Sequence, residues 1–265
     1  MPYADVNGLN LYYEDTGGDG LPVVFSHGFF MDHEMFAPQV AALRGDYRVI
    51  AWDERGHGDT EYGGGPFTYW DSARDCLGLL DHLGIDRAVL GGMSQGGFLS
   101  LRAALLAPER VAGLVLIDTQ AGIDDPETRK GYEALFQQWL AEGPVDELVR
   151  TVAGLIINDP EENERWIAKW QQRYAGAAAR KMEQPERALL NREDITDRLS
   201  EIGCPALVIH GTDDLSISID RGRELCDGLP GCVGVVPIDG AAHASNLTHP
   251  EPANAALRDF LPQVS

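Results

Sequence analysis

A serine at position 94 stands in a short run whose spacing suits nucleophilic chemistry. The run GMSQG at 92–96 has the form G-x-S-x-G, which places a serine on a sharp turn between a strand and a helix. The apolar run Ala88–Gly92 precedes it, and the helical stretch Gln95–Ala107 follows. Small residues are needed on both sides because strand and helix crowd together there. We interpret Ser94 as a nucleophile at a helix N-terminus, against the alternative of an ordinary glycine-rich turn.

A serine hydroxyl is a weak nucleophile, so it needs a base, and the base needs an acid that orients it. His243 is the preferred base because it follows the apolar run Val233–Pro237. Loops at the carboxyl ends of parallel strands surround active-site crevices. His249 is its nearest rival, but a place at the start of the last predicted helix suits a capping role.

The orienting acid has three candidates, each at the end of a predicted strand. Asp118 ends the run Val111–Ile117, and Asp213 and Asp214 follow Ala206–His210. Adjacent carboxylates cannot both face one imidazole, so one of that pair would cap the loop or face solvent. The residues alone leave all three candidates open.

Attack on a carbonyl creates a negative oxygen that needs hydrogen-bond donors. Gly28 follows the predicted strand Pro22–Ser26 and would let the backbone turn there. We expect the backbone amides of Phe29 and Gln95 to be the donors, each contributing about 3 kcal/mol of transition-state stabilisation. The alternative is an ordinary turn at a strand exit.

Apolar runs alternate with helical stretches along most of the chain, which predicts an α/β fold with a mostly parallel sheet and helices on both faces. The alternation stops near Gln120 and resumes near Cys204. We therefore expect a core of residues 1–121 and 196–265, interrupted by a helical insertion at 122–195. The other predicted strands are Leu9–Glu14 and Tyr47–Trp52, and the other predicted helices are His33–Arg44, a helix from a Thr68 cap to Gly84, Ser218–Asp227 and Glu251–Leu261.

The charge balance limits the partners. The 21 basic and 42 acidic residues give a net charge of −21, whereas nucleic acids and anionic membranes are bound by clustered Lys and Arg. The sequence has neither a signal peptide nor an apolar span, so we expect a cytoplasmic protein. Four cysteines are too few for a disulfide scaffold. Free thiols are the default expectation, and Cys226 and Cys232 could pair in an oxidising compartment.

We expect neither a metal ion nor a cofactor. The chain has no H-E-x-x-H or C-x-x-C motif, and no glycine-rich dinucleotide loop follows its first buried strand. The expected partner is therefore a small-molecule substrate, with a homo-oligomer left open.

Six segments carry a resemblance to a known family. They are HGF at 27–29, AWDERGHG at 51–58, GMSQGG at 92–97, HGTDD at 210–214, GAAH at 240–243 and PEPANAALRDFL at 250–261. Together they resemble the α/β-hydrolase superfamily, in its lidded branch with 3-oxoadipate enol-lactonases, arylesterases, cofactor-free haloperoxidases and C–C bond hydrolases. The resemblance implies Ser94 as nucleophile, His243 as base and Asp214 as acid. It also implies the amides of Phe29 and Gln95 as oxyanion donors.

The predicted insertion resembles the lid of that family. Its aromatic residues recur at helical spacing and would either pack the lid onto the core or line an apolar pocket. They are Trp166, Trp170 and Tyr174 in one cluster and Tyr132, Phe136 and Trp139 in another. We expect Phe30, Trp139 and Trp166 to line the substrate pocket.

These features predict a serine hydrolase that cleaves a carboxylic ester or lactone through an acyl-enzyme. C–C bond hydrolysis and perhydrolase or haloperoxidase activity are alternatives that use the same triad, although HGFF at 27–30 departs from the HGW typical of perhydrolases. A non-catalytic ligand receptor on the same fold is an alternative of another class. Turnover of a short-chain p-nitrophenyl ester would separate enzyme from receptor.

Overall fold

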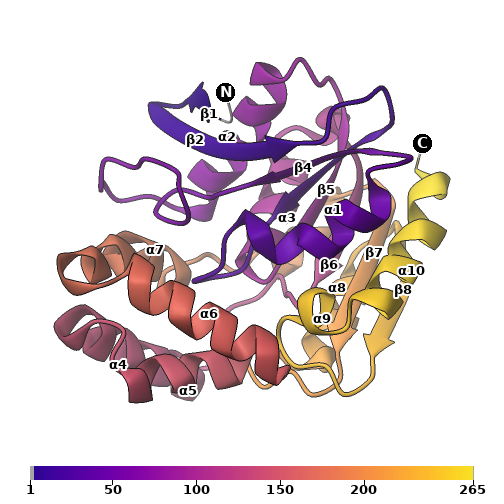
Figure 1. Ribbon diagram of the computed structural model, residues 1–265. Coiled ribbons are helices and arrows are strands. Elements are labelled where there is room, and N and C mark those ends of the chain that lie inside the picture. Colours follow the sequence, from indigo (N-terminus) through magenta and orange to yellow (C-terminus); the bar gives the residue numbers. More distant parts are fainter. Residues whose placement is uncertain (1–2, 265) are drawn as a thin grey trace.

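A twisted sheet of eight strands forms the centre of the computed structural model, which describes residues 3–264 (Figure 1). The strand order is β1-β2-β4-β3-β5-β6-β7-β8, with β3 to β8 parallel and the first two strands antiparallel to their neighbours. The strands are β1 Tyr3–Val6, β2 Leu9–Asp15, β3 Pro22–Ser26, β4 Arg48–Trp52, β5 Ala88–Met93, β6 Val111–Ile117, β7 Ala206–Gly211 and β8 Cys232–Ile238.

The central strands are covered on both faces. Every residue of β5 and β6 is buried, which explains why both read as continuous apolar runs. Helices α1 and α10 pack together on one face, and α2 and α3 pack together on the other (Figure 1). The helices of the core are α1 Ala37–Leu43, α2 Tyr69–His82, α3 Gln95–Leu106, α8 Ile219–Gly228, α9 Ser245–Thr248 and α10 Pro250–Phe260. The predicted α/β fold class is confirmed.

One local prediction differs from the structure, one is confirmed, and strand β1 was not predicted. β1 forms a hairpin with β2, and the turn residues Asn7 and Gly8 both have positive φ, 51° and 78°, as a tight hairpin turn requires. The helix predicted at His33–Arg44 divides into a 3₁₀ turn, His33–Phe36, and α1, with Pro38 in the first turn of α1. The cap predicted at Thr68 is present and forms a capping box with Asp71.

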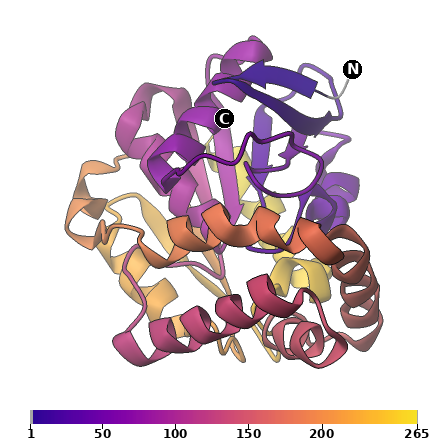
Figure 2. The ribbon, with the colours of Figure 1, turned by 90° about the vertical axis from the view of Figure 1, so that its left-hand side faces the viewer.

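Four helices connect β6 to β7 and lie as a layer at one end of the sheet, as both views show (Figures 1 and 2). Residues 122–195, where the sequence predicts a helical insertion, contain no strand. No helix within residues 3–264 is long and apolar enough to cross a membrane. The four helices are α4 Pro126–Glu142, α5 Asp146–Ile156, α6 Pro160–Arg173 and α7 Glu183–Leu190.

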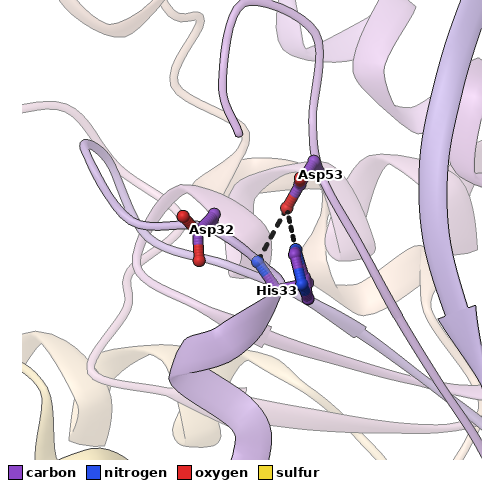
Figure 3. Close-up of side chains that lie close together, drawn as sticks. All are labelled: Asp32, His33 and Asp53. Carbon is purple, nitrogen blue, oxygen red and sulfur yellow. Dashed lines mark hydrogen bonds and ion pairs between the residues drawn. The ribbon is translucent and has the colours of Figure 1, made fainter. Parts of the chain in front are cut away.

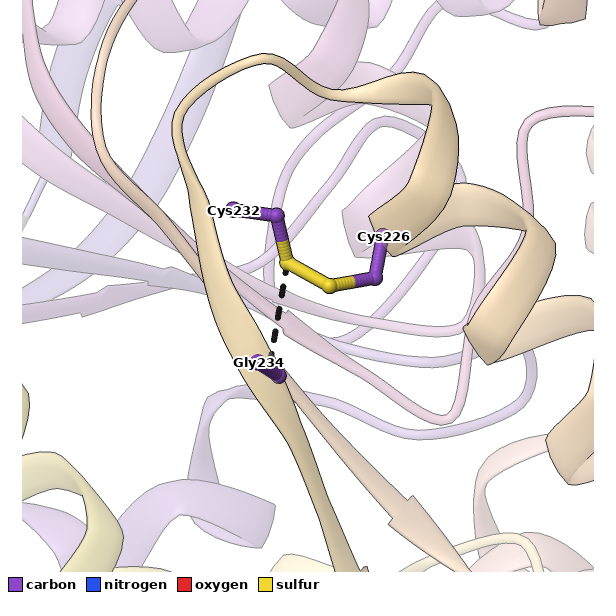
Figure 4. Close-up of a disulfide and its surroundings, with 3 residues drawn as sticks. All are labelled: Cys226, Cys232 and Gly234. Carbon is purple, nitrogen blue, oxygen red and sulfur yellow. Dashed lines mark hydrogen bonds between the residues drawn. A yellow bond between two sulfur atoms is a disulfide. The ribbon is translucent and has the colours of Figure 1, made fainter.

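A disulfide joins Cys226 of α8 to Cys232 at the start of β8 (Figure 4). The default expectation of free thiols is therefore wrong for this pair, while Cys76 and Cys204 remain free. The turn from α8 into β8 brings the two Cα atoms to 5.4 Å, within the range that a disulfide spans. Such a bond persists under oxidising conditions, whereas the cytoplasm favours thiols.

Candidate active site

Ser94 sits at the end of β5, where the chain turns directly into α3. Its backbone has φ 52° and ψ −114°, a conformation that a residue with a side chain seldom adopts. A Cβ at Gly92 would overlap the backbone of Gly96, and one at Gly96 would overlap the carbonyl of Ser26. Both glycines are therefore needed for the close approach of strand and helix that holds Ser94 at this turn.

The structure brings Ser94, His243 and Asp214 together from three separate loops. Ser94 Oγ lies 3.0 Å from His243 Nε2, and His243 Nδ1 lies 2.7 Å from Asp214 Oδ2. Each of the three residues is 7% exposed, so water reaches the chain of hydrogen bonds only at its edge. In the arrangement these contacts favour, Ser94 donates its hydroxyl proton to Nε2 and His243 donates from Nδ1 to the carboxylate.

Charges around His243 favour its protonated form. Burial alone would lower the pKa of His243, but the charge and hydrogen bond of Asp214 and the charge of Asp118 together raise it above the ordinary value. The pKa of Asp214 is shifted in the opposite direction. Burial would raise the pKa of this carboxyl, yet the neighbouring imidazoles and the amide of Ile217 hold it far below its usual range. Asp214 is therefore an anion suited to stabilising an imidazolium.

The other two candidate acids do not reach His243. Asp118 is fully buried, and it accepts hydrogen bonds from the amide of Gly211 and from the amide and hydroxyl of Ser245. These bonds join the end of β6 to the loops that carry Asp214 and His243. Burial raises the pKa of Asp118 to about 6. Asp213 faces the exposed side of its loop, where it accepts from Thr212 Oγ1 at 3.2 Å. By contact, Asp214 is the carboxylate that holds the imidazole.

A second buried histidine, His210, was not singled out from the sequence as part of this site. Its Nε2 lies 2.8 Å from the carbonyl oxygen of Ile217 and 3.4 Å from Asp214 Oδ2. A Cβ on Gly222 of α8 would press against its ring, so α8 packs directly over it. His210 thus packs between α8 and the loop that carries Asp214 and contacts that loop at both Asp214 and Ile217. The sequence signal was its place at the end of β7, four residues before Asp214.

The backbone amides of Phe29 and Gln95 have no hydrogen-bond acceptor within residues 3–264. Gln95 is the first residue of α3, so its N–H points out of the helix end. Phe29 lies just after β3, and Phe30 beside it has a positive φ of 65°. The two amides expected to bind an oxyanion are therefore both available as donors.

The segment that follows β3 is anchored where His33 contacts Asp53 (Figure 3). Asp53 Oδ1 accepts from the backbone N–H of His33 at 2.7 Å and from its Nδ1 at 2.8 Å. Burial would raise the pKa of Asp53, but the hydrogen bond and charge of His33 hold it at about 2. Asp32 in the same loop forms ion pairs with Lys169 and Arg173 of α6, at 2.7 and 3.4 Å. The insertion is thereby tied to the loop beside Ser94.

Two groups of side chains within residues 3–264 are close enough together to ligate a metal ion. In each group the carboxylates already accept protein hydrogen bonds: Asp53 from His33, and Asp118 from Ser245. Asp32 is also paired with two cationic side chains. These contacts explain why the side chains of each group lie close together. They are Asp32, His33 and Asp53 in one group and Asp118, His210 and Asp214 in the other.

A cavity lies between Ser94 and the insertion. The volume of this cavity is about 70 Å³. Most of the lining is apolar, and it comes from the core loops and from α4, α5 and α7. The lining residues are Phe29, Phe30, Met93, Ser94, Phe98, Asp124, Tyr132, Leu135, Phe136, Val152, Leu155, Ile156, Leu189, Arg192, Ser216, Ile217 and His243.

The pocket residues expected from the sequence fall into two groups. Phe30 lines the cavity, whereas Trp139 and Trp166 do not. Both tryptophans are fully buried: the Trp139 ring packs 4.4 Å from that of Phe30, and Trp166 packs against Trp170. Trp139 thus packs against a loop of the core and Trp166 against its own helix, so the expectation that the two line the pocket is corrected. Helical spacing predicted that these side chains lie on a buried face, but it does not predict which residues that face contacts.

Asp124 and Arg192 were missed altogether. They lie 68 residues apart in sequence, yet their side chains form a two-point ion pair in the cavity wall, with nitrogen–oxygen distances of 2.7 and 2.8 Å. No local spacing in the sequence predicts this ion pair, because its two residues lie at opposite ends of the insertion.

Fold and site together define a hydrolase of the α/β-hydrolase superfamily. Residues 22–250 match the family model for the alpha/beta hydrolase fold, and the chain belongs to that family. The superfamily expected from the sequence is thus confirmed.

Three known proteins illustrate the similarity. A 3-oxoadipate enol-lactonase of Acinetobacter baylyi is 31% identical over 247 residues, which cover 92% of this chain and 90% of that protein. A protein of Azorhizobium caulinodans whose name proposes carbamate hydrolysis is 29% identical over 278 residues, covering 100% and 99%. The structure of a thermophilic esterase from Thermogutta terrifontis aligns with a TM-score of 0.86 at 31% identity, covering 100% and 97%.

Proposed function

We propose that the protein hydrolyses carboxylic esters or lactones through an acyl-enzyme. Ser94 attacks the carbonyl carbon while His243 accepts its proton, and the amides of Phe29 and Gln95 bind the oxygen as it becomes negative. His243 then gives the proton to the leaving alcohol. Water attacks the acyl-enzyme, with His243 again as base, and releases the acid.

The observation that carries this proposal is the chain of hydrogen bonds from Ser94 through His243 to Asp214, at 3.0 and 2.7 Å. A base within hydrogen-bond reach of the serine and a buried carboxylate behind the base are what acyl transfer by serine requires. The similarity to an enol-lactonase and an esterase supports the same class of substrate.

Carbamate cleavage is a second candidate, supported by the similarity over the whole chain to the Azorhizobium protein. A carbamate also presents a carbonyl to the serine, so the same groups would act. Parallel assays with aryl acetates and aryl carbamates would rank the two substrates.

We further propose that residues 122–195 act as a lid. Helices α4, α5 and α7 supply much of the cavity wall, and the pairs between Asp32 and α6 attach the insertion to the loop that carries Phe29. In this role the insertion excludes water from the reacting carbonyl and limits the size of the substrate.

The proposed nucleophile is tested by replacing Ser94 with alanine. We expect Ser94→Ala to lower kcat for p-nitrophenyl acetate by at least about 10³-fold, because only binding and the oxyanion donors remain. Ser100→Ala is the matched control, since Ser100 is a buried serine of the same helix that bonds to the carbonyl of Gly96. Loss of activity in the control alone, or full activity in Ser94→Ala, would contradict the proposal.

A further inference from the structure

The cavity wall beside Ser94 contains a buried ion pair whose charges cancel. Arg192 is 3% exposed at its side chain and Asp124 is 9% exposed. Both carboxylate oxygens of Asp124 accept hydrogen bonds from the Arg192 guanidinium, at 2.7 and 2.8 Å. Gln120 Nε2 donates to one of these oxygens at 3.1 Å. A charged pair with this geometry fixes both partners and leaves no net charge at the wall.

The guanidinium has few donors left for a substrate. Its Nε donates to the carbonyl of Gly122 at 3.3 Å, and Nη1 donates to the carbonyl of Leu189 at 3.0 Å in addition to Asp124. The guanidinium carbon also lies 4.7 Å from the centre of the Phe98 ring, which covers one of its faces. Arg192 is therefore occupied by the protein itself.

No other lysine or arginine lines this cavity within the described chain. Apart from Asp124, Arg192 and the Ser94 centre, the polar lining consists of Tyr132 and Ser216. A substrate carboxylate would have to leave water, lie near Asp124 and compete with it for Arg192. Bringing like charges together in this way is unfavourable, and more so in a buried wall than in water.

We propose that the Asp124–Arg192 pair makes the site selective for small, uncharged esters and lactones and excludes substrates that carry a carboxylate. This inference rests on the proposed function and narrows its substrate class. The cavity of about 70 Å³ is small and mostly apolar, which suits a short, uncharged group beside the serine.

The Acinetobacter relative supplies a sharp contrast. It is named a 3-oxoadipate enol-lactonase, and the enol-lactone of this diacid keeps one free carboxylate. α-Angelica lactone has the same ring with a methyl group in place of the carboxymethyl group. The two lactones share the reacting carbonyl but differ in charge and in size, so the change of their ratio in a variant of Asp124 is what isolates the effect of charge.

The experiment measures kcat/KM for both lactones with wild-type protein, Asp124→Asn and Asp75→Asn. We expect the wild type to prefer α-angelica lactone by at least about 100-fold, and Asp124→Asn to reduce this ratio at least about tenfold because Arg192 loses its counter-charge. Asp75→Asn is the matched control. It breaks another buried ion pair, with Arg55, whose residues do not line the cavity, and it should leave the ratio unchanged.

Binding separates this inference from the proposed function. Titration calorimetry of Ser94→Ala with each lactone should show binding of α-angelica lactone and at least about tenfold weaker binding of the carboxylated one. Absence of turnover with preserved charge selection would overturn the proposed function alone. Equal or tighter binding of the carboxylated lactone, an unchanged ratio in Asp124→Asn, or no binding of α-angelica lactone would overturn the charge selection.

Discussion

The end of the sheet that carries Ser94 and the helical insertion above it are built under different constraints. A Cβ at Gly92 or Gly96 would collide with backbone, so the turn at Ser94 admits little change. Gly131 in α4 and Gly154 in α5 would meet nothing within 4 Å. The reacting groups are therefore held where added side-chain atoms would collide with backbone, while these positions of the insertion leave room for substitution.

The two regions also differ in how their charges are used. In the core, Asp118, Asp214 and His243 are buried close together and shift one another's pKa values. In the insertion many ion pairs are exposed, such as Arg150 with Glu164, and these contribute little to stability. The buried Asp124–Arg192 pair is different because it faces the cavity. Substitutions in the core should therefore change the rate of reaction, and those in the insertion should change the choice of substrate.

The largest effect should come from the acid behind His243. Asp214→Asn should lower kcat by about 10⁴-fold, because an amide can neither hold the correct tautomer nor stabilise the imidazolium. Asp213→Asn, one position away and directed at Thr212, should change kcat by less than about threefold. Steady-state kinetics of both variants test this contrast, and a dead Asp213→Asn beside an active Asp214→Asn would reverse the assignment.

The next effect is on stability and compares a glycine from each region. Gly96→Ala should destabilise the fold by at least about 3 kcal/mol, because its Cβ would overlap the carbonyl of Ser26. Gly154→Ala, on the exposed side of α5, should raise stability by up to about 1 kcal/mol through helix propensity. Denaturant unfolding measures both. Equal tolerance of the two substitutions would remove the contrast between the regions.

A smaller effect is expected on the preference for long over short acyl chains. Leu135 of α4 lines the cavity, so Leu135→Ala should raise the ratio of kcat/KM for a hexanoate ester over an acetate ester by about tenfold. Gln137→Ala, on the exposed face of the same helix, should leave the ratio unchanged. A chain-length series of p-nitrophenyl esters gives the ratio. A fall in kcat with no change in preference would show that α4 acts on the reaction itself.

The smallest effect concerns pH. His243 must be neutral to accept a proton, and its pKa is raised above 6.5, so kcat/KM should fall as pH drops through a value above 6.5. The charge of Asp118 contributes to this rise, so Asp118→Asn should move the acidic limb to lower pH by less than about one unit. Profiles from pH 5 to 9 measure the shift. A limb that moves to higher pH would contradict the electrostatic account.

Spacing along the chain was sufficient to predict the layout of the core. The strand-turn-helix pattern around Ser94 and the strand end before His243 predicted that the serine and its base meet at one edge of a parallel sheet, and their side chains do lie in contact there. Position at a strand end left three carboxylates open as the acid, and the family resemblance favoured Asp214, which contacts His243. Each of these signals is local, because a parallel strand is a continuous apolar run and its end is marked by polar residues.

Contacts within the insertion could not be read in the same way. Helical periodicity shows that Trp139 has a buried face but not that this face meets Phe30 instead of the cavity. Asp124 and Arg192 pair across 68 residues, and a single sequence has no signal at that distance. The pairing of Cys226 with Cys232 depended on a turn geometry that their spacing of six residues permits but does not require.

The most direct test of the central claim is covalent labelling with a fluorophosphonate, followed by peptide mapping. Because Ser94 alone is hydrogen-bonded to His243 in the described structure, we expect one adduct per chain, on the peptide that contains Ser94, and none in Ser94→Ala. His243→Ala should slow the labelling strongly. An adduct on another serine, or undiminished labelling of Ser94→Ala, would show that the reacting group is not the one held at the end of β5.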